Sequence, residues 1–312
     1  MFISLGLKLS KEFWKNIIGS ILIILASFVG QIPLLLGFAI KTINSGGAFP
    51  SSNKEMMTYL SPNLTLFLIL LSFVFALIAF YYIVVYFHKQ PFIEVTTARK
   101  KVDWKRVFFS FGIWAAFTII STLAAFYINP NDYVINFKPV PFAILFVIAT
   151  LLIPVQTSLE EYVFRGYLMQ GFAILAKNKW FPLIMTSVIF GLLHLANPEV
   201  EKLGYIIMVY YIGTGLFLGI LTLMDDGMEL SLGFHAANNL IGALLITADW
   251  SAFQTHSILK DVSKPTAGFD VILPIVIIFP LLLFIFSKKY HWSNWKEKLT
   301  GKIGLELENK NN

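Results

Sequence analysis

The chain has 312 residues, of which 57% are hydrophobic, 16% are aromatic and only 13% are charged, and its mean hydropathy is +0.72. Soluble domains use about 45–50% apolar residues, so this composition excludes a soluble protein and indicates a polytopic membrane protein. The absence of cysteine excludes disulfides, thiolate metal sites and cysteine nucleophiles. The net charge of +6 comes from basic loops and tails, which favours contact with the lipid bilayer and argues against nucleic-acid binding.

The first 139 residues predict an interfacial helix followed by three membrane spans. Residues 1–16 interleave Phe, Leu and Trp with lysines, a pattern typical of a helix that lies at the membrane surface. Apolar runs at about residues 17–40, 62–87 and 107–128 then predict the spans. A basic loop, residues 88–106, separates the second span from the third.

Residues 140–176 form one long apolar segment. As a single straight helix it would measure about 54 Å, whereas a hydrocarbon core is about 30 Å thick. We therefore expect Pro154 to bend or break it. Further spans are predicted at about residues 180–196, 203–224, 229–248 and 271–287. The sequence thus predicts an all-α, polytopic transmembrane helical bundle of about eight spans with its active site in the bundle core.

The domain organisation follows from this series of spans. Residues 1–139 contain the interfacial helix and three spans, residues 140–250 form the core that carries the motifs described below, and residues 251–312 contain a loop, the last span and a basic tail. Seventeen of the 24 Lys and Arg residues fall on the side of the termini, in segments 8–15, 89–106, 177–179 and 288–310, and six fall on the other side. This bias predicts that both termini are cytoplasmic, in what composition suggests is a bacterial cytoplasmic membrane.

Ionisable groups at membrane depth cost a few kcal/mol each, so each needs a reason. Three lie within six residues, Glu160, Glu161 and Arg165. On a helix, Glu161 and Arg165 are four apart and neutralise one another as an ion pair. Glu160 points about 100° away, which leaves it facing the bundle interior as a candidate general base.

Two histidines also lie in predicted spans. His194 shares a helix face with Phe190, and a single histidine on an apolar face is more often a packed core residue than a catalyst. His235 and Asn239 are four apart and therefore present two polar groups on one face. Small neighbouring residues let another helix or a substrate backbone approach closely: Gly233, Ala236, Ala237 and Gly242.

Two kinds of site fit these residues. In the first, Glu160 activates a water that attacks a carbonyl, His194 orients the water or transfers a proton, and His235 with Asn239 stabilises the oxyanion. In the second, Glu160, His194 and His235 ligate zinc and leave water in the fourth position. Counting ligands does not separate the two.

The three motifs have a family resemblance. EEYVFR at 160–165 matches EExxxR, FGLLH at 190–194 matches FxxxH and HAANN at 235–239 matches HxxxN. In this order, on successive spans, they resemble the CPBP family of intramembrane proteases, which includes the type II CAAX prenyl endopeptidases and the bacteriocin-processing or Abi-type proteins. The resemblance covers about a third of the chain.

The resemblance implies an intramembrane endopeptidase that acts on a membrane-embedded or lipidated protein or peptide. By position, Glu160 and His194 activate water, His235 and Asn239 form the oxyanion hole, and Glu161 and Arg165 hold the site together. The family is usually labelled as metalloproteases, yet it includes a glutamate-dependent member without bound metal. We expect metal-free catalysis here, with a divalent metal such as zinc as the alternative.

Two other functions stay open at this point. A protein of the same family could act without proteolysis, as a bacteriocin self-immunity factor or as a membrane partner. A transporter could use Glu160, Glu161 and Arg165 as a permeation site, although the sequence has no evident internal repeat.

The three motifs are predicted to lie at different depths in the membrane, measured along each helix from its end nearest the termini. Glu160 is about 25 Å before Lys177 and His194 is about 21 Å after Trp180, whereas His235 is only about 9 Å beyond Glu229. Either Asp225, Asp226 and Glu229 line a wet vestibule, or the motif helix lies at a shallower depth than its span suggests.

Overall fold

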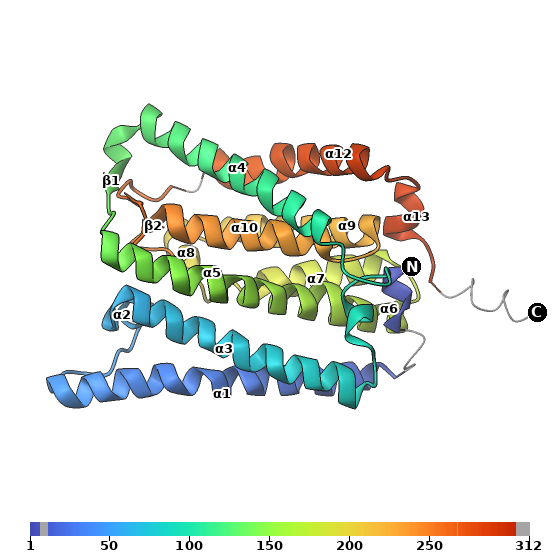
Figure 1. Cartoon of the computed structure of the whole chain (residues 1–312), viewed down its shortest axis with the longest axis horizontal. Helices are drawn as coiled ribbons and strands as arrows, with labels where there is room; N and C mark the ends of the chain where they lie inside the picture. The colour runs from blue at the N-terminus through green and yellow to red at the C-terminus, as the bar shows by residue number, and fades with distance from the viewer. Residues whose placement is uncertain (7–11, 267, 304–312) are drawn as a thin grey trace, which may run out of the picture.

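The apolar runs fold into helices, which satisfy every backbone polar group within their own segment. The computed structural model describes residues 1–6, 12–266 and 268–303 (Figure 1). The main helical segments run between the two ends of the bundle: α1 (Phe13–Ser45), α3 (Pro62–Tyr82) with η3 (Ile83–Phe87), α4 (Trp104–Ile128), α5 (Pro139–Glu161) with η6 (Tyr162–Leu168) and α6 (Met169–Ala176), α7 (Trp180–Leu192), α9 (Ile207–Asp225), α10 (Glu229–Leu245), and α11 (Phe269–Leu273) with η7 (Pro274–Ile278) and α12 (Phe279–Tyr290).

This architecture confirms the predicted all-α membrane bundle, but it does not confirm the count of eight spans. Within the described ranges, six helices are long and apolar enough to cross a membrane. The other two predicted spans correspond to α7, with 13 residues, and α10, with 17, whereas about 20 are needed to cross. His194 lies just after the shorter helix α7, and His235 lies on the shorter helix α10.

Pro154, at which we expect a bend or a break, does not break the long segment. Helix α5 runs through Pro154, and helical structure continues from Pro139 to Ala176. Proline is tolerated in membrane helices because packed neighbours compensate for the lost hydrogen bond. The irregularity lies instead in η6, a π-helical stretch that begins directly after Glu161 and contains Arg165; such stretches are frequent at functional sites.

A small sheet covers the end of the bundle opposite the N-terminus. Its strands are β1 (Tyr133–Ile135), β2 (Ile246–Ala248) and β3 (Leu259–Asp261). Strand β3 is central, antiparallel to β1 and parallel to β2. The short helices α2 (Asn53–Tyr59) and α8 (Pro198–Leu203) lie at this same end (Figure 1), which we call the capped end.

The opposite end contains the N-terminal residues and α13 (Trp295–Thr300), and we call it the terminal end (Figure 1). There the basic segment 88–103 folds against the bundle. Arg99 contacts the carboxylates of Asp225 and Glu229 at 3.1 and 3.0 Å. Asp225 and Glu229 are 5% and 0% exposed, so these two residues do not line a wet vestibule, whereas the side chain of Asp226 is 33% exposed.

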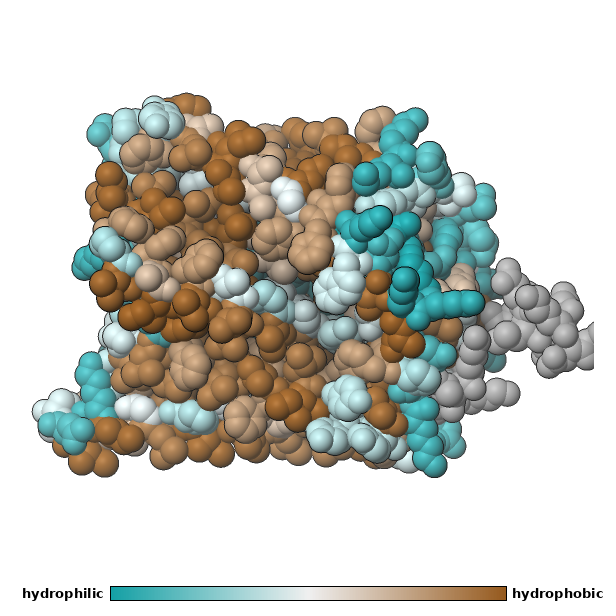
Figure 2. All heavy atoms as spheres, in the orientation of Figure 1, coloured by the Kyte–Doolittle hydropathy of each residue, from teal (hydrophilic) through white to brown (hydrophobic). Residues whose placement is uncertain are grey.

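The first residues also pack into the terminal end. Residues Phe2–Ser4 form a single turn, η1, with Phe2 and Ile3 buried, and the Phe2 amide donates to the Asp226 carboxylate at 3.1 Å. The interfacial helix predicted over residues 1–16 is therefore absent from residues 1–6, and its residues 7–11, with Lys8 and Lys11, lie outside the described ranges. Figure 2 shows hydrophilic residues gathered at the terminal end beside a broad apolar belt.

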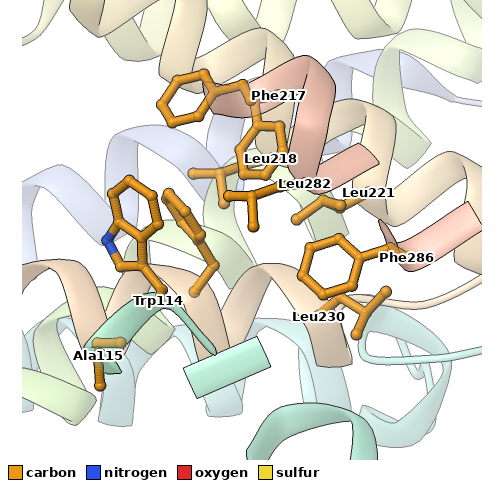
Figure 3. Packing of buried hydrophobic residues seen from close by; sticks show 11 residues of the cluster. Trp114, Ala115, Phe217, Leu218, Leu221, Leu230, Leu282 and Phe286 are labelled. Carbon is orange, nitrogen blue, oxygen red and sulfur yellow. The ribbon is translucent and has the colours of Figure 1, made fainter. Parts of the chain in front are cut away.

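Close helix contacts depend on glycine. The GxxxG pair Gly215 and Gly219 on α9 lies against α7, where a Cβ at Gly215 would be 2.9 Å from the Ser187 carbonyl oxygen. Aromatic and leucine side chains fill the space between α4, α9, α10 and α12 (Figure 3). Close packing of backbones together with a filled core holds the short helix α10 in place.

Gly233 provides a direct test of this packing. A Cβ at Gly233 would lie 2.1 Å from the Val107 carbonyl oxygen of α4, whereas a Cβ at Gly242 meets nothing within 4 Å. We expect Gly233→Ala to lower the stability by about 1–3 kcal/mol, since the two backbones must separate. Thermal unfolding in detergent measures the effect, with Gly242→Ala as the matched control. Equal melting temperatures for the two variants would contradict the packing described.

Candidate active site

The structure brings the predicted site residues together from three helical segments. Glu160 lies near the end of α5, His194 lies in the turn after α7, and His235 and Asn239 lie on α10. These four side chains line one cavity with a volume of about 690 Å³. The two predicted supporting residues, Glu161 and Arg165, lie outside its lining and are both 0% exposed.

The ion pair expected between Glu161 and Arg165 is present, with 3.0 Å between Oε1 and Nη1. The second guanidinium nitrogen donates to the Gly215 carbonyl of α9 at 3.2 Å. The guanidinium also stacks on the Phe190 ring of α7, 4.4 Å from its centroid. Arg165 therefore connects η6, the segment that contains it, to α7 and α9. The planar guanidinium, with its several donors, can make these contacts at once, whereas the ammonium group of a lysine cannot.

His235 lies between the two motif carboxylates. Its Nδ1 is 2.8 Å from Oε1 of Glu161 and its Nε2 is 3.5 Å from Oε2 of Glu160. Because Arg165 holds Glu161 in its ionised, acceptor form, Nδ1 carries a hydrogen and donates it. The other ring nitrogen, Nε2, therefore faces Glu160, at a distance too long for a strong hydrogen bond.

His194 is oriented by the end of its helix. Helix α7 ends at Leu192, so the span predicted to reach residue 196 is too long, and residues 193–196 form a turn. Nδ1 of His194 lies 2.7 Å from the Phe190 carbonyl oxygen, one of the carbonyls that a helix end leaves without a partner. A carbonyl only accepts, so Nδ1 is the donor, and Nε2 is left for groups in the cavity that His194 lines. Tyr211 stacks on the ring at 4.5 Å.

Gln156 is a site residue that the sequence reasoning missed. Its amide nitrogen donates to Oε1 of Glu160 at 2.5 Å, and its amide oxygen accepts from Nδ2 of Asn239 at 3.1 Å. Asn239 in turn accepts from Asn238 at 3.0 Å, and Asn238 accepts from Trp114 at 3.1 Å. This chain of hydrogen bonds fixes the orientation of the Asn239 amide relative to Glu160. The four-residue spacing of Gln156 and Glu160 on an apolar helix is the signal that could have found it.

A second carboxylate, Glu199 of α8, also lines the cavity. Its Oε1 accepts from the Ala252 amide at 2.7 Å, whereas its buried Oε2 has no hydrogen-bond partner among the described residues. Burial raises the pKa of the Glu199 carboxyl, and the Ala252 amide and His194 partly oppose the shift. In the sequence, Glu199 looks like an ordinary charge in the first turn of a surface helix.

Glu199 therefore predicts a pH-dependent stability. A carboxyl group with a higher pKa in the folded state than in the unfolded state lowers the stability of the fold at any pH where it is ionised. This loss of stability is therefore present at neutral pH. It disappears as the pH falls below the pKa of the group in the unfolded chain, about 4.3. We expect Glu199→Gln, which keeps an acceptor for Ala252, to raise the melting temperature at pH 7.5 by on the order of 2 °C. Melting curves at pH 7.5 and pH 4 measure this, and an equal gain at both pH values would contradict it.

The residues predicted as zinc ligands do not gather as a three-ligand group. Across the described ranges, no three or more His, Cys, Asp or Glu residues are placed to hold a metal ion. Both nitrogens of His235 face carboxylates, and Nδ1 of His194 is bonded to the backbone. A catalytic zinc site needs three protein ligands, so this arrangement does not fit one. Catalysis without a metal, with zinc as the alternative, stays a prediction.

Fold and site together define a class: an integral membrane helical bundle with carboxylate, imidazole and amide groups around a cavity between its helices. Residues 139–241 match the family model described as type II CAAX prenyl endopeptidase Rce1-like. The chain is 31% identical over 231 residues to the uncharacterized protein YyaK of Bacillus subtilis (strain 168), an alignment that covers 73% of this chain and 77% of the relative. No solved structure matches the chain.

The chain belongs to the Rce1-like type II CAAX prenyl endopeptidase family. The predicted family is thereby confirmed, and at the level of the family the chain is a CAAX-type intramembrane protease. The matched segment contains all three motifs, from Glu160 to Asn239.

Proposed function

We propose that the protein is an intramembrane endopeptidase that hydrolyses a peptide bond of a membrane-associated protein or peptide with water activated by Glu160. One observation carries this proposal. Oε2 of Glu160 is buried and has no hydrogen-bond partner among the described residues, in a side chain that lines the cavity shared with His194, His235 and Asn239. An unpaired carboxylate oxygen at such a place is suited to take a proton from water.

The steps follow from the positions of the groups. Glu160 takes a proton from water, and the resulting hydroxide attacks the scissile carbonyl carbon. The Asn239 amide and His235 donate hydrogen bonds to the developing oxyanion, and neither gives up a proton in the step. The intermediate collapses, the carbon–nitrogen bond breaks, and the proton held by Glu160 passes to the leaving amine. His194, whose Nδ1 donates to the Phe190 carbonyl, orients the water with its Nε2. The products are a carboxylate and an amine.

The bilayer defines the class of partner. The cavity lies in a membrane bundle, and its lining includes the apolar side chains of Ile69, Phe73 and Phe164. Such a lining favours a membrane-embedded or lipidated segment over a free polar peptide. We place the protein in a bacterial cytoplasmic membrane, which the bacterial source of its relative supports.

The experiment is a comparison of membrane peptides in cells that produce the wild type, Glu160→Ala or the control Glu201→Ala, whose side chain is 72% exposed. We expect a membrane protein to be shortened in the wild type and in the control, and to accumulate uncut in Glu160→Ala. If a phenotype of the gene's loss is rescued equally well by Glu160→Ala, the protein acts without proteolysis and the proposal fails.

A further inference from the structure

Glu199 lines the cavity but has no part in the proposed cleavage steps. It lies in the first turn of α8, and its Oε1 accepts from the Ala252 amide at 2.7 Å, which ties α8 to the loop after β2. The oxygen of a glutamine could accept the same hydrogen bond. The contact with Ala252 therefore does not explain why a charged side chain stands at this position.

The second carboxylate oxygen of Glu199 is unpaired. Oε2 is buried and has no hydrogen-bond partner among the described residues. Over the same ranges, no Lys or Arg forms an ion pair with Glu199, and the neighbouring pair of Glu201 and Lys202 is exposed. A buried carboxylate without a partner lowers the stability of a fold. Natural proteins retain such a loss mainly where the group serves a function.

The cavity as a whole lacks a basic side chain. Among the described residues, three carboxylates line it, those of Glu160, Glu199 and Asp261, whereas none of the lining residues is Lys or Arg. The cation of the motif, Arg165, is paired with Glu161 outside the lining. A cation that enters the cavity therefore meets carboxylates and no competing basic group.

Aromatic side chains adjoin the Glu199 carboxylate. Trp250 lines the cavity and stands two residues before Ala252, whose amide binds Glu199. Tyr211 also lines the cavity, and its hydroxyl accepts at 3.4 Å from the side chain of Asn197, the residue that precedes α8. A carboxylate near aromatic rings suits an ammonium or guanidinium group, because the carboxylate pairs with the cation and the faces of the rings attract it.

We propose that Glu199 forms a subsite for a cationic group, either a Lys or Arg side chain or an amino terminus, of the peptide that occupies the cavity. A cation bound there gives Oε2 its missing partner, and Trp250 and Tyr211 lie beside it. That this peptide is a substrate rests on the proposed function, whereas the binding of the cation does not.

The lining indicates the rest of the bound peptide. Apolar side chains such as Ile69 and Phe73 make up much of the cavity wall, so the peptide combines an apolar stretch with a basic group. Trp250 and Ala252 lie beyond residue 241, where the match to the family model ends. The loop that completes the subsite is therefore outside the matched segment, and we expect the preference for a cation to differ among members of the family.

Binding to a variant without the proposed base tests the subsite. Immobilised Glu160→Gln protein, in an uncharged maltoside detergent, is offered short Ala–Leu peptides with blocked ends that carry Lys, or its uncharged analogue norleucine, at each position in turn. A third series carries norleucine and a free amino terminus. Mass spectrometry counts the retained peptides. The same mixture is offered to Glu160→Gln with Glu199→Gln, which keeps the acceptor for Ala252, and to the matched control, Glu160→Gln with Glu201→Gln.

We expect the Glu160→Gln protein and the control to retain one cationic series about tenfold or more over the blocked norleucine series, as for a hydrogen bond to a charged group. Addition of Glu199→Gln should abolish this preference. Retention of the Lys series identifies a side chain as the ligand, and retention of the free-amine series identifies an amino terminus. Equal retention of all three series, including no retention, would overturn the proposal, as would a preference that survives Glu199→Gln. No outcome depends on cleavage, so the role of Glu160 stands or falls separately.

Discussion

Replacement of Glu160 by glutamine is expected to lower the rate of peptide cleavage by purified, reconstituted protein by about 10²–10⁴-fold, the usual contribution of a general base. Glutamine keeps the size of the side chain and an oxygen that can accept from Gln156. In the wild type, the amide nitrogen of Gln156 lies 2.5 Å from Oε1 of Glu160. It cannot take a proton from water. The fold should therefore persist while the chemistry stops. The measurement is the cleavage rate of the substrate found in the peptide comparison.

The matched control for this prediction is Glu201→Gln, which makes the same chemical change on an exposed side chain. Its rate should equal that of the wild type, and the melting temperatures of all three proteins should agree. A Glu160→Gln variant that cleaves at the control's rate would end the assignment of Glu160 as the base.

Replacement of Arg165 by methionine should cost about 3–5 kcal/mol of stability, because it leaves a buried carboxylate without its partner. Glu161 is 0% exposed and lies 3.0 Å from Arg165. The variant also loses the bond to the Gly215 carbonyl and the stacking on Phe190. Thermal unfolding in detergent should show a fall in melting temperature on the order of 10 °C.

Two further variants separate the buried charge from the loss of packing. The double variant Glu161→Gln with Arg165→Met removes both charges and should recover part of the lost stability. Lys296→Met, at an exposed position of α13, should leave the melting temperature unchanged. A single Arg165→Met variant as stable as the wild type would refute the structural role of the pair.

The long apolar helices were predictable from the sequence because hydropathy alone determines them in a membrane. The range of residues 62–87 coincides with α3 and η3. What hydropathy could not give are the features made by contacts between distant segments. The three strands are each three residues long, and β1 pairs with a strand more than 100 residues away, as Tyr133 pairs with Asp261. The insertion of Phe2 and Arg99 into the terminal end is equally non-local.

In the site, too, local contacts were predictable from the sequence and contacts between distant helices were not. Four-residue spacing on a helix predicted the contact of Glu161 with Arg165, because local geometry determines it. The bridge from Glu160 through Gln156 to Asn239 joins α5 to α10, and no local pattern records which helices meet. The early end of α7 was missed because the apolar run continues past His194, so hydropathy could not show where helical structure stops.

The central claim is that Glu160 activates water and is not itself the nucleophile. A single turnover of the reconstituted protein in water enriched in oxygen-18, followed by mass spectrometry of the product and of the Glu160 peptide, tests it directly. We predict that one labelled oxygen enters the new carboxylate of the product and none enters Glu160. Label in Glu160 with an unlabelled product would show covalent attack by the carboxylate and contradict the mechanism.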